Sequence, residues 1–125
     1  MTKKREILIG IGTGEDQAKS FVSAWKRAKK GLAAERPINR LHFADTATLF
    51  KYLSPKRFEL LQQLHAIGPL SIRKLATELH RDYKNVHTDV KELQNIGLIE
   101  ETRESLFVVP WDVIITELQL MAKAT

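Results

Sequence analysis

Apolar residues in the first part of the chain follow two periods, first every second position and then every third or fourth. Residues 6–11 alternate and are β-branched, which predicts a strand. Residues 15–30 carry one apolar stripe at three- and four-residue steps, which predicts a helix. Residues 39–43 alternate again, and residues 45–52 begin with a helix cap. We therefore expect a small β-α-β-α extension over residues 1–53.

Three helices are predicted in the middle of the chain. Ser54 and Pro55 predict a helix start, because serine accepts from free N–H groups and proline at the first helical position loses no hydrogen bond. Ser71 and Asp82 predict the caps of two more helices. The side chains expected to face inward are Phe58, Leu61, Leu64 and Ile67 on the first, Ile72, Leu75, Ala76 and Leu79 on the second, and Val86, Val90 and Leu93 on the third.

A hairpin and a last helix are predicted after Gly97. Residues 98–99 and 106–109 would pair as two short strands, and Pro110 would precede a helix over residues 111–122. That helix carries more apolar side chains than one stripe needs, so it either covers its own domain or joins two copies of the chain. We favour the dimer. The side chains concerned are Trp111, Val113, Ile114, Ile115, Leu118, Leu120 and Met121.

The charge of the chain is uneven along its length. The formal net charge is +5, and residues 1–54 hold 11 basic and 5 acidic side chains, whereas residues 55–110 hold 8 of each. A basic chain favours an acidic partner such as nucleic acid. The chain has no cysteine, which excludes disulfides and thiolate metal sites and favours a reducing compartment. With no apolar run long enough to span a bilayer, we expect a cytoplasmic protein.

One segment carries a family resemblance. The run LATELHRDYKNVHTDVKELQNIGLIE, residues 75–100, resembles the helix-turn-helix and the start of the wing in MarR-like winged-helix regulators. With the Gly68-Pro69 turn, it resembles in particular a family of small bacterial and archaeal DNA-binding proteins. The resemblance covers residues 54–110 and implies an α+β fold with a winged helix-turn-helix of three helices and a two-stranded wing. Some members of that family look like antitoxins of toxin–antitoxin pairs.

The predicted third helix of this domain has two opposite faces. With Val86 at zero, Val90 and Leu93 fall within about 40° of it at 100° per residue. Four polar residues fall between about 140° and 200°, where a recognition helix needs its groups for DNA. They are Lys84, Thr88, Lys91 and Asn95.

The expected DNA-binding set extends beyond that face. Tyr83, Asn85 and His87 lie near the N-terminal end of the helix, and asparagine can pair with adenine through two hydrogen bonds. Arg73 and Lys74 begin the preceding helix and would meet phosphates. The turn contributes Arg81, and His80 stands there where glycine is common. The wing has Arg103 among Glu100, Glu101 and Glu104, so it would touch one phosphate or none.

Three other patterns have ordinary explanations. The glycines at positions 10, 12 and 14 have the wrong spacing for a dinucleotide-binding loop and favour a tight turn. The basic run over residues 26–30 is typical of a solvated helix face, or alternatively of a phosphate contact or a dock for an acidic protein. The four histidines, His42, His65, His80 and His87, lack metal-ligand spacing. We expect no cofactor, no metal and no enzymatic activity.

The sequence therefore predicts three parts: the extension over residues 1–53, a DNA-binding domain over residues 54–110, and a C-terminal dimerisation helix over residues 111–125. The predicted function is a sequence-specific transcriptional regulator, a homodimeric repressor that acts by occluding its operator. The alternative is a protein-interaction module, an antitoxin whose N-terminal half binds its toxin.

Overall fold

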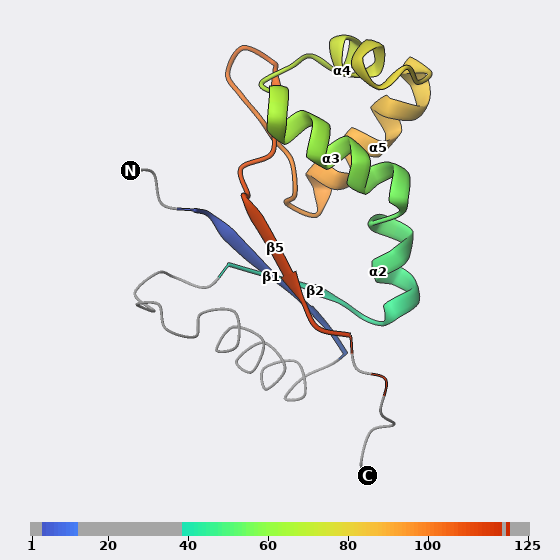
Figure 1. Cartoon of the computed structure of the whole chain (residues 1–125), viewed down its shortest axis with the longest axis vertical. Helices are drawn as coiled ribbons and strands as arrows, with labels where there is room; N and C mark the ends of the chain where they lie inside the picture. Colours follow the sequence, from blue (N-terminus) through green and yellow to red (C-terminus); the bar gives the residue numbers. More distant parts are fainter. Residues whose placement is uncertain (1–3, 13–38, 119, 121–125) are drawn as a thin grey trace. The chain divides into compact units, whose positions relative to one another are not determined.

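The computed structural model describes residues 4–12, 39–118 and 120 (Figure 1). The chain divides into two compact units. The first combines Met1–Arg5 with Phe50–Asp112, and the second combines Glu6–Leu49 with Val113–Thr125. The α+β class expected from the sequence is confirmed, since both helices and small sheets are present. Within the described part of the chain, no helix is both long and apolar enough to cross a membrane.

The second unit contains a parallel sheet in the order β2-β1-β5. Strands β1 (Glu6–Ile11) and β2 (Asn39–Phe43) have the bounds that the alternation predicts, and β5 spans Val113–Thr116. β1 pairs with β2 from Ile7↔Asn39 to Ile11↔Phe43, and with β5 from Glu6↔Val113 to Ile9↔Thr116. The residues from Ile7 to Gly10 are all buried, so both faces of β1 are covered, as is typical of a parallel sheet.

β5 corrects the prediction of a C-terminal helix. The residues 113–116 are extended and paired with β1, although a helix was expected from Trp111 onward. The physical reason is that Val113, Ile114, Ile115 and Thr116 form an unbroken β-branched run, which favours extended backbone and packs well in a sheet. The later part of the expected helix, residues 119 and 121–125, lies outside the described residues. So do the helix expected over residues 15–30, the basic run within it, and Gly14.

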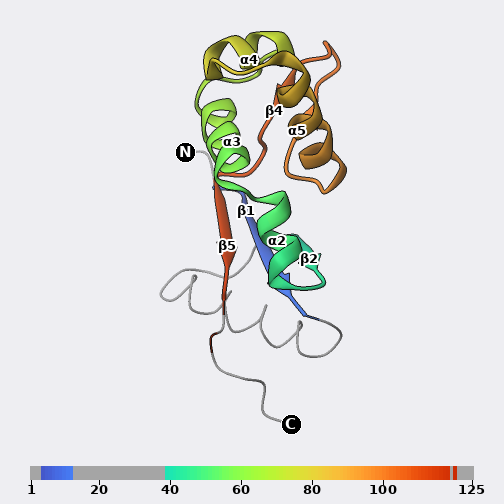
Figure 2. The ribbon, with the colours of Figure 1, turned by 90° about the vertical axis from the view of Figure 1, so that its right-hand side faces the viewer.

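The first unit consists of helices and a hairpin (Figure 2). Helix α2 (Thr46–Tyr52) leads into it from the second unit, and α3 (Pro55–Ile67), α4 (Ile72–Leu79) and α5 (Tyr83–Asn95) follow. β3 (Glu100–Glu101) and β4 (Phe107–Val108) form an antiparallel hairpin. The helices start where the sequence predicts them, because the caps form: Ser54, Ser71 and Asp82 each accept a hydrogen bond from the backbone N–H three residues later.

The core of this unit differs in detail from the expected one. Phe58 and Ile67 are each 43% exposed, whereas Leu60 is completely buried and joins Leu61 and Leu64 on the inward face of α3. The buried face of α3 is therefore rotated around the helix axis relative to the predicted face. The apolar residues of α3 are numerous enough to form more than one stripe, so the sequence alone did not decide which stripe is buried. The first hairpin strand also begins two residues later than expected, since Leu98 and Ile99 pack in the core instead. The faces predicted for α4 and α5 are confirmed at Ile72, Leu75, Ala76, Val86, Val90 and Leu93, while Leu79 is half-buried.

A polar cluster joins the two ends of the first unit. The Arg5 N–H donates to Asp112 Oδ2 at 2.9 Å, and the Asp112 N–H donates to the Arg5 carbonyl at 2.7 Å. His65 Nε2 lies 2.8 Å from Asp112 Oδ1. The Arg5 backbone donor, followed by the hydrogen bond with His65, holds the pKa of the Asp112 carboxyl below its usual value. Beside them the Trp111 indole N–H donates to the Gly97 carbonyl at 2.8 Å, and the Arg5 guanidinium covers its ring.

Candidate nucleic-acid interface

The turn between α4 and α5 sets the direction of the second helix. His80 ends α4 in the left-handed conformation, with φ 54° and ψ 44°. Its N–H bonds to the Thr77 carbonyl, and the Arg81 N–H bonds to the Ala76 carbonyl, the paired arrangement that closes many helix C-termini. Glycine usually occupies this position because a side chain strains it. His80 therefore adopts a conformation that is strained for a residue with a side chain, at a position where glycine is common.

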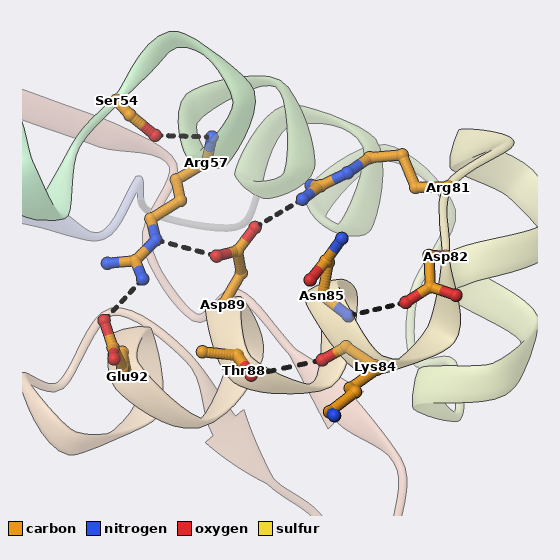
Figure 3. Close-up of polar contacts among 9 residues, drawn as sticks. All are labelled: Ser54, Arg57, Arg81, Asp82, Lys84, Asn85, Thr88, Asp89 and Glu92. Carbon is orange, nitrogen blue, oxygen red and sulfur yellow. Dashed lines mark hydrogen bonds and ion pairs between the residues drawn. The ribbon is translucent and has the colours of Figure 1, made fainter.

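α5 presents the polar face that the helical projection predicts. Val86, Val90 and Leu93 are fully buried, and the side chains at Lys84, Thr88 and Lys91 are exposed, as are Asn85 and Asn95. The Thr88 hydroxyl donates to the Lys84 carbonyl one turn earlier at 3.1 Å, which fixes the rotamer of that hydroxyl (Figure 3). The exposed face of α5 therefore carries ammonium, amide and hydroxyl groups together, and we call Lys84, Asn85, Thr88 and Lys91 the polar face.

Aromatic and basic side chains meet at the N-terminal end of α5. The Arg73 guanidinium carbon lies 4.9 Å from the centre of the Tyr83 ring, a cation–π contact that ties the first turn of α4 to the first turn of α5. The His87 and Tyr83 ring centres are 5.9 Å apart. Arg73 and Tyr83 are exposed, His87 is half-buried, and Lys74 is exposed next to Arg73. The structure thus brings Arg73, Tyr83 and His87 together at one end of the polar face, and Lys74 follows Arg73 on α4.

Arg81 differs from the other basic residues of the predicted set. Its Nη2 donates to Asp89 Oδ2 at 2.7 Å, and its side chain is 20% exposed. The other oxygen of Asp89 accepts from Arg57 Nε at 3.0 Å, and Arg57 Nη2 donates to Glu92 (Figure 3). We call Arg57, Arg81, Asp89 and Glu92 the charge network. The Arg81 guanidinium thus braces α5 through Asp89, and its charge is already paired within the unit.

The charge network has the electrostatics of a semi-buried ion pair. Burial acts to lower the pKa of Arg57, but the hydrogen bonds and charges of Glu92 and Asp89 outweigh burial, so that the pKa is raised. Sequence reasoning missed Arg57, Asp89 and Glu92. One signal was present, because Asp89 lies only about 60° from Val86 in the helical projection, near the buried stripe where an acid needs a partner.

The hairpin contributes little positive charge. Arg103 is exposed near its tip, but Glu100, Glu101 and Glu104 are exposed on the same hairpin. The Lys91 ammonium lies 5.3 Å from the centre of the Phe107 ring on β4, so the C-terminal half of the polar face adjoins the hairpin. Of the predicted basic residues, Arg73, Lys74, Lys84 and Lys91 lie on α4 and α5. Arg103 lies on the hairpin, where its neighbours in the sequence include Glu101 and Glu104.

The comparisons with known proteins place the chain in one family. The HVO_A0114 family model matches residues 52–116, just over half of the chain, from the end of α2 to the last residue of β5. The chain belongs to this family. No curated protein and no solved structure matches the chain.

Proposed function

We propose that the protein is a winged helix-turn-helix regulator that binds double-stranded DNA through α4 and α5. The observation that carries the proposal is the division of α5 into a fully buried face and an exposed polar face. A helix that enters the major groove needs donors and acceptors for base edges on one side and a fixed attachment to its domain on the other. The MarR-like resemblance of residues 75–100 supports the same conclusion.

The roles within the interface follow from the chemistry of the side chains. Arg73, Lys74, Lys84 and Lys91 bind phosphates as cations, while Asn85 and Thr88 contact base edges. Tyr83 and His87 pack against the sugar-phosphate backbone beside Arg73. The charges of the network are already compensated, so Arg57 and Arg81 act on DNA binding only through the position of α5.

The biological role that fits this interface is repression by occlusion. The protein would bind its operator as a homodimer and block transcription by occupying the site, with no chemical reaction and no cofactor. The alternative from the sequence, an antitoxin that also binds a toxin through its N-terminal half, stays a prediction. The basic run that would supply its dock lies outside the described residues.

The test is the salt dependence of binding to the promoter DNA next to the gene. Affinity should fall steeply with salt, and each of Arg73→Ala, Lys74→Ala, Lys84→Ala and Lys91→Ala should flatten the logarithmic slope by about one unit. Lys51→Ala is the matched control, because it removes an exposed lysine outside α4 and α5. Fluorescence anisotropy at a series of salt concentrations measures both the affinity and its logarithmic slope against salt. Absence of binding at low salt, or an equal effect of Lys51→Ala, would show that α4 and α5 are not the DNA-binding surface.

A further inference from the structure

The outer edge of β5 is a row of backbone groups with no described partner. β1 is central in the three-stranded sheet, and it occupies one side of β5. Within the residues that the structure describes, no strand pairs with the other side of β5. The side chains of Val113, Ile114 and Ile115 are only half-buried. An edge strand of this kind is a template for pairing with a further strand.

β5 also lacks the features that protect edge strands. Proteins usually block a sheet edge with charged side chains, proline or a bulge. β5 has the sequence Val-Ile-Ile-Thr, which contains no charge and no proline. β2, at the opposite edge of the same sheet, carries exposed Arg40 and His42. The two edges thus differ in charge, because the four residues of β5 carry none, whereas β2 carries Arg40.

We propose that β5 pairs in antiparallel fashion with β5 of a second copy of this chain. A two-fold axis through the middle of the strand would place Val113 opposite Thr116 and Ile114 opposite Ile115. A register shifted by one residue would instead place Ile114 opposite Ile114, or Ile115 opposite Ile115, of the second copy. The paired strands join the two sheets into one continuous sheet. Leu118 and Leu120, exposed just beyond the strand, extend the apolar surface that the second copy covers.

This inference rests on the proposed function in one respect, because a homodimer presents two DNA-binding surfaces to a two-fold symmetric operator. Its interface is a strand edge, in place of the terminal helix expected from the sequence. Pairing of β5 can be measured without DNA, so its failure is distinguishable from a failure of DNA binding.

Sedimentation of the full chain tests the pairing. The unmodified chain at about 10 μM should sediment at twice the monomer mass, Ile115→Lys should sediment as a monomer, and Leu41→Lys should stay dimeric. Leu41 is the matched control because it is a half-buried aliphatic residue on β2, the other edge strand. A monomeric unmodified chain overturns the proposal, and so does a dimer that Leu41→Lys breaks and Ile115→Lys does not.

Cross-linking tests the same pairing in variants that add no charge. The chain has no cysteine, so a single introduced cysteine forms a disulfide only between copies. Residues directly opposite in an antiparallel pair have Cα atoms about 4.5–5.5 Å apart, within disulfide range. Of Ile114→Cys, Ile115→Cys and their equimolar mixture, at least one should cross-link on mild oxidation, and Leu41→Cys should not. Equal cross-linking by Leu41→Cys, or none by any β5 variant, overturns the proposal.

Discussion

Loss of the Asp89 carboxylate is predicted to destabilise the first unit more than loss of any exposed acid. Asp89 is 14% exposed and accepts from Arg57 and Arg81, whose side chains are 11% and 20% exposed. Removing one partner of a buried ion pair costs about 3–5 kcal/mol. Glu92 still holds Arg57, and Arg81 is partly hydrated, so we expect Asp89→Ala to lower the free energy of unfolding by about 2–3 kcal/mol.

Urea unfolding of the full chain, followed by circular dichroism, measures this loss. With a slope of about 1–3 kcal/mol per molar urea, the midpoint should fall by about 0.7–3 M. Glu59→Ala, at an exposed position on α3, should change stability by less than about 0.5 kcal/mol.

A double-mutant cycle of Asp89→Ala with Arg81→Ala isolates the pair itself, and a coupling above about 0.5 kcal/mol is expected. Additive effects of the two substitutions, or a loss from Asp89→Ala no larger than that from Glu59→Ala, would refute the bracing role of the charge network.

Three further predictions follow from single features of the structure. His80→Gly should raise the free energy of unfolding by about 0.5–1 kcal/mol, because relief of left-handed strain exceeds the added freedom of the unfolded chain; His80→Ala should give no gain, and a destabilised glycine variant would contradict the assignment. Asn85→Ala and Thr88→Ala should each cost about 1–3 kcal/mol at the operator and little on random DNA, in competition binding assays; equal losses on both DNAs would mean that neither reads bases. Because the folded pKa of Asp112 lies below its unfolded value, its carboxylate stabilises the fold fully above about pH 4, and that stabilisation is lost as the pH falls through the folded pKa. Asp112→Asn should therefore flatten the acid limb of stability measured against pH, and an unchanged acid limb would contradict the assignment.

Local signals account for the parts of the fold that the sequence predicted correctly. Ser54, Ser71 and Asp82 start their helices through contacts only three residues long, so the residue types alone were sufficient. The exposed side of α5 was predictable for the same reason, since Val86 and Val90 fix its buried side.

Distant partners account for the parts that were missed. β5 is a strand because it pairs with β1, about a hundred positions earlier in the chain, and Thr116 bonds to Ile9 across a separation of 107. Asp89 is positioned by Arg57, from which it is separated by 32 residues. Neither partner can be read from a local window. The β-branched run of β5 was a local signal for a strand, but its aliphatic side chains also fitted a helical stripe, and the prediction followed the stripe.

The mutual hydrogen bonds of Arg5 and Asp112 have a consequence for the order of folding. β1 is synthesised first and β5 last, so their pairing closes a loop of more than a hundred residues, which is slow for a flexible chain. The first unit is built mostly from helices in sequence order, whose contacts are local and form fast. The hydrogen bonds between Arg5 and Asp112 span the same separation of 107 residues, and they join the residues directly before β1 and β5. Once Arg5 and Asp112 have met, the register in which Glu6 pairs with Val113 is fixed, and β1 and β5 need no further search for alignment.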